Sequence, residues 1–483
     1  MLSIFHSLSS PRPTVLAAAA LLALMSPHAH ADEQATLQAL KQQIEDMRQQ
    51  YESRLQALEQ KLEQAQAQAL SRQQAAHNAL PPAQPDPQAQ PAAVLAAPAK
   101  NMDNRFNPSM SVILSGTYAS IKQDPGTWAL SGFQLGSDGH GVGPGERGFN
   151  LGESEVSFRA SIDPWVMGSL TLGIEDDHGV GIEEAFVQST SLPHGLTLKG
   201  GRFFSSVGYQ NEQHAHARDF VDAPFVQQAF LNGQYAQDGA QVKWVLPTLQ
   251  YVELGAELGN GKAYPGADRN SNKPGATVLF ARTGDDIGDS HSWRLGLSWM
   301  RTRSADRLWG GAGHDHDHGG EEHAGEEMLF SGTSRLWVVD GVWKWAPNGN
   351  ASSTSFKLQG EYFWRKESGT ATVLADEVLE DEGDYRSSQS GWYLQGVYQF
   401  MPKWRVGLRY DRLNQGTVRT LVEDLQPERH NPKRTSLMMD WSPSEFQRWR
   451  IQINEDRARL GIKDTQVYLQ YQMSLGAHGA HSF

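Results

Sequence analysis

Apolar and polar side chains alternate along residues 391–410, which read GWYLQGVYQFMPKWRVGLRY. Trp392, Leu394 and Tyr398 fall on one parity, and a second alternating run begins at Trp404 after a short Pro-containing break. Because successive side chains of a strand point to opposite faces, this segment predicts a β-hairpin with one apolar and one polar face. Aromatic residues at the ends of the apolar face are typical of a surface that contacts lipid.

The same two-faced pattern recurs from Met110 onwards. It predicts an all-β fold, a transmembrane β-barrel of about sixteen antiparallel strands within a range of about fourteen to eighteen. The barrel must close, because an open sheet edge in lipid leaves backbone groups unpaired. The parity of the last strand continues to Phe483, an arrangement that resembles the assembly signal of bacterial outer-membrane proteins.

The connections between the predicted strands support a barrel with both termini in the periplasm. Short turns should then alternate with long loops. Long connections are expected at about 122–150, 208–238, 262–274, 304–333, 366–389 and 416–433, with short turns between them. The exception is the connection near Asp177, which is short where a long loop is due.

Three segments precede the barrel, which we place at 110–483. Residues 1–31 are expected to be a secretory signal peptide, with an apolar run at 15–25 and the cleavage pattern Ala29-His30-Ala31. Residues 32–80 contain apolar positions spaced three and four apart, which predicts an α-helical coiled coil; a solitary amphipathic helix is the alternative. Residues 81–109 begin with a Pro/Ala-rich stretch that predicts an extended linker.

Composition excludes several classes of protein. A mean hydropathy of -0.53 rules out a helical membrane protein, and a net charge of -13 argues against nucleic acid as a partner. The absence of cysteine excludes disulfides, thiolate metal sites and thiol nucleophiles. No Gly-x-Ser-x-Gly, phosphate-binding Gly-rich loop or His-Glu-x-x-His motif occurs, so we expect no enzyme and no required cofactor.

Two of the long loops carry candidate metal ligands. Imidazole and carboxylate groups suit Zn(II), and we expect transient binding of zinc. The first set lies at 209–238, and the second lies on a Gly-rich loop: Glu212, His214 and His216; and His314, Asp315, His316, Asp317, His318, Glu321, Glu322 and His323. The alternatives are that the first set braces its loop against the barrel wall and that the second is a solvated low-complexity loop.

The polar face of the predicted strands supplies basic side chains that we expect to line the pore: Arg159, Lys243, Arg294, Lys357, Arg405 and Arg409. Such residues favour anions in a water-filled bore, but they also serve simply to keep a bore hydrated.

Several long runs resemble a proteobacterial outer-membrane family catalogued as zinc-regulated TonB-dependent outer-membrane receptors. These runs are FNPSMSVILSGTYASI (106–121), GYQNEQHAHARDFVDAP (208–224), KWAPNGN (344–350), QSGWYLQGVYQFMPKWRVGLRYDRL (389–413) and QYQMSLGAHGAHSF (470–483). The resemblance implies zinc-linked uptake. TonB-dependent receptors, however, carry a globular plug domain, which the stalk and linker expected at 32–109 cannot form.

A separate resemblance, to general porins of sixteen strands, implies that the loop at 209–238 folds into the barrel. The predicted function is therefore an outer-membrane porin-type channel of a Gram-negative bacterium. Small solutes or ions diffuse through it, and its His-rich extracellular loops capture divalent metal, zinc first. The alternatives are a general or anion-preferring porin, a TonB-dependent zinc receptor and a structural tether. The expected partners are outer-membrane lipid and further copies of the chain, three by analogy, joined through the coiled coil in the periplasm.

Overall fold

The computed structural model describes residues 108–136, 142–175, 179–310, 327–375, 378–422 and 428–476. All of them belong to one compact unit, 100–483. The predicted signal peptide, coiled coil and most of the linker lie outside the described residues, as does Phe483. Among the described residues, no helix is long and apolar enough to cross a membrane.

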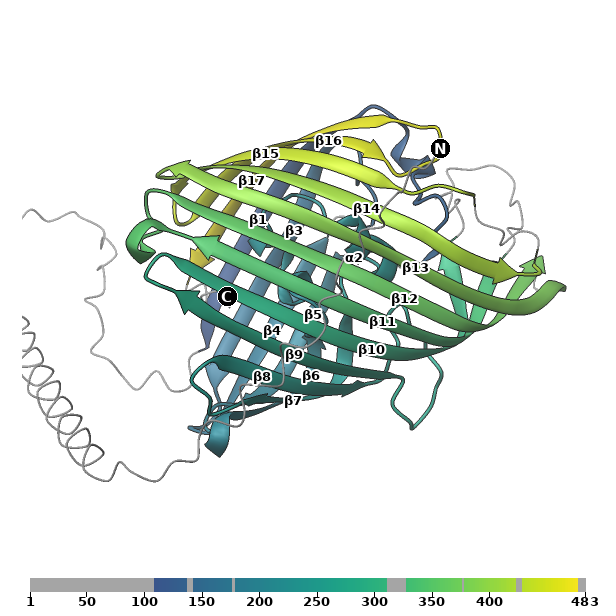
Figure 1. The fold of residues 1–483 in the computed structure, drawn as a ribbon, viewed down its shortest axis with the longest axis horizontal. Helices are drawn as coiled ribbons and strands as arrows, with labels where there is room; N and C mark the ends of the chain where they lie inside the picture. The colour runs from purple at the N-terminus through teal and green to yellow at the C-terminus, as the bar shows by residue number, and fades with distance from the viewer. Residues whose placement is uncertain are drawn as a thin grey trace, which may run out of the picture. The chain divides into compact units, whose positions relative to one another are not determined.

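Sixteen strands form a closed antiparallel wall in the described part of the chain (Figure 1). They are β1 (Ser109–Ile121), β3 (Gly148–Ser161), β4 (Val166–Glu175), β5 (Gly179–Ser189), β6 (Leu196–Phe204), β7 (Ala236–Val245), β8 (Tyr251–Gly259), β9 (Ala276–Ile287), β10 (His291–Gly310), β11 (Glu327–Trp345), β12 (Ser355–Ala375), β13 (Val378–Met401), β14 (Trp404–Thr420), β15 (Lys433–Ser444), β16 (Gln447–Arg457) and β17 (Asp464–Gly476). Strand β1 pairs with β3 on one edge and with β17 on the other, which closes the barrel. The prediction of about sixteen strands is confirmed.

The remaining elements are short and lie in the connections. A two-residue strand, β2 (Leu135–Gly136), pairs with the end of β10. The helical segments are η2 (Pro125–Thr127), η3 (Pro193–Gly195), η4 (Gln210–Glu212), η5 (Ala215–Ala217), α2 (Phe225–Leu231) and η6 (Pro347–Gly349). The connection between β4 and β5 is short, as its sequence indicated.

The alternation of side chains separates a lipid-compatible outer face from a polar inner face. On β14, Leu408 is 56% exposed whereas Arg409 is 1% exposed. Pairs of aromatic rings on neighbouring strands mark both ends of the outer apolar band, among them Trp337 with Trp364 and Trp404 with Trp441. Tryptophan and tyrosine prefer the boundary between hydrocarbon and water, so the band has the form of a surface embedded in a bilayer.

The prediction of a long loop at 366–389 is wrong. Strand β12 continues to Ala375 and β13 starts at Val378, with the two strands paired from Lys366↔Ser388 to Ala375↔Val378. Strands β10 and β11 likewise extend into the loop expected at 304–333. A strand needs an apolar face only where it meets lipid, so its pairing can continue after the apolar pattern ends.

We expect a cation placed on the outer face to destabilise the barrel. Leu297 is 55% exposed and lies between Trp293 and Trp299 on β10. The change Leu297→Arg should lower the free energy of unfolding by about 2–4 kcal/mol, the cost of a basic side chain near the bilayer midplane. Equilibrium denaturation in lipid vesicles measures it, with Leu297→Phe as a control. Equal stability of the two variants would contradict the assignment of this face to lipid.

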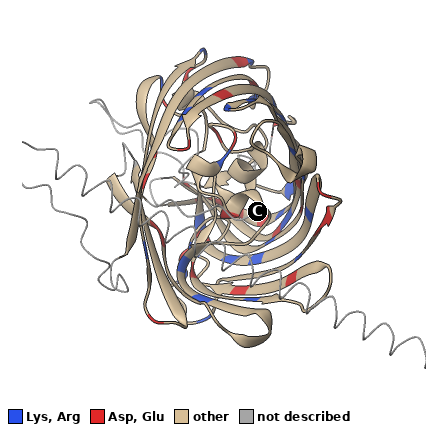
Figure 2. Cartoon of the chain, turned by 90° about the vertical axis from the view of Figure 1, so that its left-hand side faces the viewer, with Lys and Arg blue, Asp and Glu red and all other residues tan. Residues whose placement is uncertain are grey.

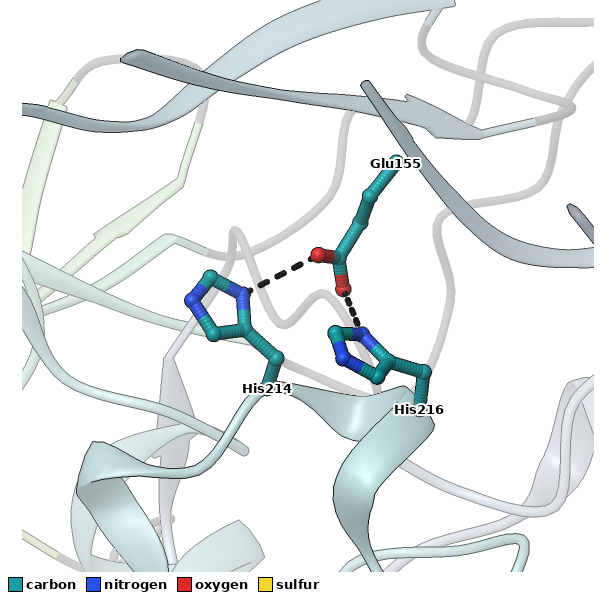
Figure 3. Close-up of side chains that lie close together, drawn as sticks. All are labelled: Glu155, His214 and His216. Atoms are coloured by element: carbon teal, nitrogen blue, oxygen red, sulfur yellow. Dashed lines mark hydrogen bonds and ion pairs between the residues drawn. The ribbon is translucent and has the colours of Figure 1, made fainter. Parts of the chain in front are cut away.

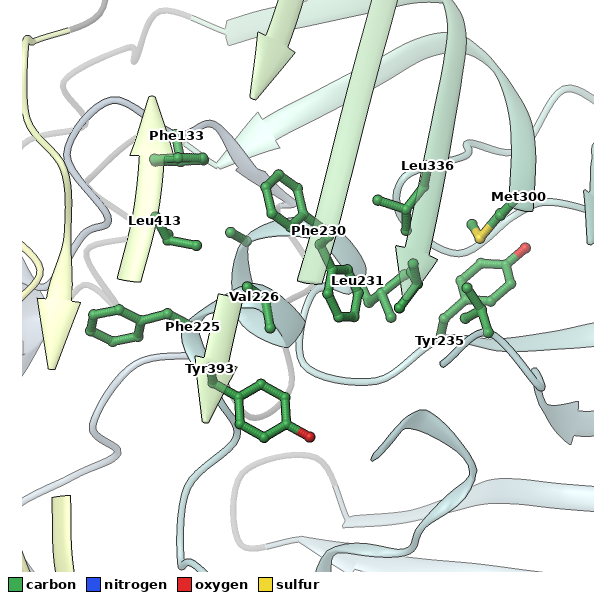
Figure 4. Close-up of a cluster of buried hydrophobic side chains, with 14 of the residues drawn as sticks. Phe133, Phe225, Val226, Phe230, Leu231, Tyr235, Met300, Leu336, Tyr393 and Leu413 are labelled. Carbon is green, nitrogen blue, oxygen red and sulfur yellow. The ribbon is translucent and has the colours of Figure 1, made fainter. Parts of the chain in front are cut away.

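The loop between the fifth and sixth wall strands, residues 205–235, folds into the barrel, and we call it the inward loop (Figure 2). Its helix α2 packs against β12, β13 and β14. Phe225, Val226 and Phe230 are completely buried in an apolar cluster with Tyr393 and Leu413 of the wall (Figure 4). The first connection contributes Leu130 and Phe133 to the same cluster. Part of the barrel interior is therefore a dry core rather than open bore.

Wall carboxylates accept hydrogen bonds from the backbone of the inward loop. Ser206 donates its backbone N–H to Glu257 (2.8 Å), Tyr209 to Glu361 (2.6 Å) and Phe225 to Asp411 (3.0 Å). An irregular segment has few partners of its own for these groups, and leaving them unpaired inside the barrel would be costly. The inward loop is thus attached along β8, β12 and β14.

Candidate metal site in the barrel interior

Two histidines of the inward loop meet a carboxylate of the barrel wall (Figure 3). His214 precedes η5 and His216 lies within it, so both rings turn toward β3. The His216 Nδ1 atom lies 2.7 Å from Glu155 Oε1, and the His214 Nδ1 atom lies 3.3 Å from Glu155 Oε2. Their rings are stacked, with centroids 5.5 Å apart.

Two consecutive carboxylates of β5 complete the surroundings of His214. Glu183 Oε2 lies 3.1 Å from Nδ1 and Glu184 Oε2 lies 3.2 Å from Nε2. Neighbouring residues of a regular strand face opposite ways, but β5 has a register irregularity here against Thr171 and Leu172 of β4. A β-bulge allows two successive side chains to share a face.

The cluster has the donors of a divalent-metal site. Ligand atoms of Glu155, His214 and His216 all lie within 4.8 Å of one another, and so do those of Glu153, Glu155 and Glu183. Zinc binds imidazole nitrogen and carboxylate oxygen at about 2.0–2.2 Å, so small side-chain rotations would bring the first three groups to bonding distance. Glu155 belongs to both groups.

Charge balance in the cluster also favours a cation. Burial opposes protonation of His214, but hydrogen bonds to Glu155, Glu183 and Glu184 outweigh it and raise the pKa of the imidazole well above its usual range. A proton on His214 therefore balances several carboxylates. A divalent cation in this position would displace the proton and supply one more positive charge than it.

The structure separates Glu212 from the two histidines, which corrects the prediction that the three act together. Its carboxylate lies 2.6 Å from Arg282 Nη2 and accepts a hydrogen bond from the Ser206 hydroxyl. Burial alone would raise the pKa of Glu212, but Arg282 and then Lys243 lower it to about 2. This ion pair fastens the inward loop to β9.

The second predicted set of ligands lies outside the described residues, so the structure says nothing about it. This set comprises His314, Asp315, His316, Asp317, His318, Glu321, Glu322 and His323.

The predicted pore-lining cations are mostly engaged by acidic groups. Arg405 pairs with Asp219 of the inward loop (3.1 Å) and with Asp440, and Lys357 also pairs with Asp219. Arg409 pairs with Asp222 at 2.6 Å.

Arg294 lies 3.7 Å from Asp340. Lys243 borders a cavity of about 540 Å³ near the turn between β7 and β8, together with Glu212 and Arg282. Arg159 is exposed near the end of β3.

A cavity of about 480 Å³ borders the candidate metal site. Its lining includes Glu153, Glu183 and Arg218, with Phe204 beside them. Phe204 also packs edge-on against the ring of His214, with centroids 5.0 Å apart. Glu153 and Glu183 thus border this cavity, whereas the two histidines are not among its lining residues.

Sequence reasoning missed Glu153, Glu155, Glu183 and Glu184. A signal was present, because the adjacent pair Glu183-Glu184 interrupts the alternation of β5. A β-bulge is one way in which two consecutive side chains can share a face. The residues that these two side chains face could not be predicted without the fold.

Gly173 on β4 provides the space that Glu183 occupies. A Cβ atom on Gly173 would lie 2.3 Å from Glu183 Oε1 and 3.1 Å from its Cδ atom. We expect Gly173→Ala to push this carboxylate away from His214 and to weaken zinc affinity by about 10-fold, as loss of an outer-shell partner does. Isothermal titration checks this, with Gly181→Ala as control, because a Cβ there meets nothing within 4 Å. Equal weakening in both variants would contradict the role of Gly173.

The ion pairs that Asp219 and Asp222 of the inward loop form with the wall should resist acid down to about pH 4. Burial would raise the pKa values of Asp219 and Asp222, but neighbouring cations hold both well below the usual range. These cations are Lys357 and Arg405 for Asp219, and Arg409 and Arg434 for Asp222. A lowered pKa stabilises the folded state above the ordinary aspartate pKa of about 3.9, and this stabilisation is lost only as pH falls through the folded pKa. Hydrogen exchange of the amides at 219–226, corrected for its intrinsic dependence on pH, should show constant protection between about pH 5 and 8. Loss of protection in this segment near pH 6 would contradict this account.

No family model matches the chain. An uncharacterized protein of Aquifex aeolicus (strain VF5) is 30% identical over 373 residues, which cover 72% of this chain and 73% of that protein. The chain belongs to the same family as this protein.

Solved structures with similar folds are outer-membrane proteins. One is the loop-deleted OmpT of Vibrio cholerae, with a TM-score of 0.46 and 9% sequence identity over 76% of this chain and 99% of that chain. Another is the channel DcaP of Acinetobacter baumannii, with a TM-score of 0.44 and 11% sequence identity over 76% of this chain and 97% of that chain. A third is the anion-selective porin from Comamonas acidovorans, with a TM-score of 0.43 and 10% sequence identity over 76% of this chain and 99% of that chain.

Proposed function

We propose that the protein is an outer-membrane porin-type channel of a Gram-negative bacterium, through which small solutes or ions diffuse. The support is a closed sixteen-stranded wall in the described residues, with an apolar outer band between aromatic rings. We further propose that Glu155, His214 and His216 bind a divalent cation, zinc first, at the narrow part of the route. The observation that carries this step is the approach of their ligand atoms to within 4.8 Å inside the barrel.

The His-rich segment 311–326 extends this proposal to the cell exterior. Four imidazoles and several carboxylates among glycines suit loose and fast-exchanging capture of zinc. In this scheme the segment raises the local concentration of zinc at the mouth. The proposed assembly is a homo-oligomer, three chains by analogy, joined by the coiled coil expected at 32–80 in the periplasm.

Two alternatives receive less support. An anion-preferring pore requires free cations in the bore, yet Arg405, Arg409 and Lys357 are paired with acidic groups of the inward loop. A TonB-dependent receptor resembles the chain by sequence runs, but such receptors have about twenty-two strands, and the described wall has sixteen.

Planar-bilayer recording of the purified full chain tests the proposal. We expect stable conductance, a reversal potential on the cation side, and a change of single-channel current in micromolar zinc that a chelator reverses. Zinc entry into liposomes loaded with a fluorescent indicator measures the flux directly. Strong anion selectivity with no response to zinc would leave a general porin, and absence of any conductance would refute a channel.

A further inference from the structure

A row of basic side chains lies on the outer face of the barrel, on the side of the long loops. It follows directly after the circle of aromatic residues that borders the apolar band on that side. Five residues on five strands form it, and we call it the basic belt: Arg301, Arg335, Lys366, Arg412 and Lys433. Their neighbours along the strands are buried inside the barrel, for example Thr302 and Ser334. The belt therefore faces away from the bore and plays no part in the proposed metal site.

The belt has a fixed relation to the aromatic ring. Trp299, Trp337 and Trp364 lie opposite one another on β10, β11 and β12. On each strand the next outward position, two residues toward the long loops, is basic, and on β14 Arg412 follows Tyr410 in the same way. Two residues of strand span about 7 Å, so the cations lie at the level of lipid headgroups if the aromatics mark the hydrocarbon boundary.

Like charges face each other across the strands of the belt. Arg301 pairs directly with Arg335, and Arg335 with Lys366. Arg412 pairs directly with Lys433. Such pairs repel, and a sheet that keeps them gains only if something negative lies between them.

Acidic side chains of the described residues do not supply that charge. No ion pair to a carboxylate occurs for the five belt residues within the described ranges, and the Arg301 Nε atom is buried without a hydrogen-bond partner. Lys366 instead packs over the ring of Trp364, 4.3 Å from its centroid. By contrast, the exposed Arg202 on β6 is neutralised by Asp238 at 2.7 Å.

We propose that the basic belt binds the phosphate groups of the glycolipid in the outer leaflet. Guanidinium groups bind phosphate oxygens through paired hydrogen bonds, and lysine adds a point charge. From β10 to β15 the belt spans five inter-strand spacings, about 24 Å, which is enough for several phosphate groups. This inference rests on the membrane location proposed above and is independent of zinc binding.

Binding of purified lipid A to the detergent-solubilised full chain tests the proposal by native mass spectrometry. The variant R301Q/R335Q/K366Q should lose about 100-fold in affinity, since each cation near a lipid surface contributes roughly a factor of five to ten. The matched control K122Q/K273Q/R429Q removes three exposed charges in connections outside the belt and should bind like the wild type. Dephosphorylated lipid A should bind the wild type as weakly as the variant.

Unchanged affinity of the belt variant, or equal binding of the dephosphorylated lipid, would overturn the proposal that the belt binds phosphate. Equally tight binding of phosphatidylglycerol would overturn the assignment to the glycolipid. Heat-modifiable migration on gels verifies that the variant is folded. If the triple variant does not fold, Lys366→Gln and a salt titration of the wild type replace it. Affinity that does not fall between low and high salt would also overturn the proposal, because exposed ion pairs are screened.

Discussion

Zinc affinity of the barrel interior should fall by at least about 100-fold when His214 and His216 are both replaced by alanine, because loss of an outer-shell partner alone already costs about 10–100-fold. Both imidazoles lie within reach of Glu155, and His214 also contacts Glu183 and Glu184. Without them, only carboxylates remain, and carboxylate oxygen alone suits magnesium or calcium better than zinc. Selectivity should therefore change together with affinity.

Titration of the purified barrel with zinc, and the zinc response of single-channel current, measure this effect. The variant His194→Asn/His291→Ala is a matched control, because His194 lies in the η3 turn with φ 60° and His291 packs on Trp343 at the start of β10. Asparagine tolerates the left-handed backbone at position 194. To isolate the interior site, the same measurement is made with His314, His316, His318 and His323 replaced. Retention of wild-type affinity in the interior double variant would refute the site.

Asp222→Ala should release the inward loop from the wall. Asp222 contacts Arg409 at 2.6 Å and Arg434 at 2.7 Å, and it also accepts hydrogen bonds from Gln452 and Asn454. Both arginines are 2% exposed or less and also share the buried carboxylate of Asp411, so removing Asp222 leaves two buried cations with one carboxylate between them. Breaking a buried ion pair on one side costs about 3–5 kcal/mol, and we expect this cost to appear as detachment of the loop rather than unfolding of the wall.

Hydrogen exchange of the amides at 219–226 measures the detachment. Protection there should fall by about 100-fold or more, since about 1.4 kcal/mol corresponds to a factor of ten. Asp268→Ala is the control, because Asp268 forms an exposed pair with Lys262 that contributes about 0–1 kcal/mol. Conductance of the Asp222 variant should become noisier and more anion-selective as the arginines lose their partner. Unchanged protection of the loop would show that the dry core around α2 holds it without this ion pair.

The wall could be predicted from sequence because its two faces meet different solvents. Leu408 and Arg409, or Leu437 and Ser436, differ in polarity for the same reason that they differ in exposure. The ends of β12 and β13 could not be predicted, because polar side chains dominate them and their few apolar ones point inward instead of toward lipid. Ala371, Val373 and Tyr385 pack there with Trp309 and Phe330 of the neighbouring strands.

The interior site was predicted only in part. The His-x-His pattern in the inward loop made His214 and His216 candidates, and the structure brings both to Glu155. The position of the loop within the barrel was expected from a resemblance rather than from its residues. Glu155 and Glu183 lie far from the histidines in sequence, and their approach depends on strand register and on a bulge in β5. Glu212 was a natural candidate because it lies close in sequence, but Arg282 holds it elsewhere.

The unequal height of the wall has a consequence for access at the cell surface. Strand β13 has 24 residues, which at about 3.3 Å per residue and a tilt of about 45° rise about 55 Å, whereas β8 has 9 and rises about 20 Å. A bilayer core is about 30 Å thick, so the wall at β13 extends well beyond the lipid whereas the wall at β8 does not. The mouth is therefore slanted. Large molecules such as antibodies encounter the taller part of the wall, at β13, first. The shortest path for a dissolved ion begins at the lower part, at β8.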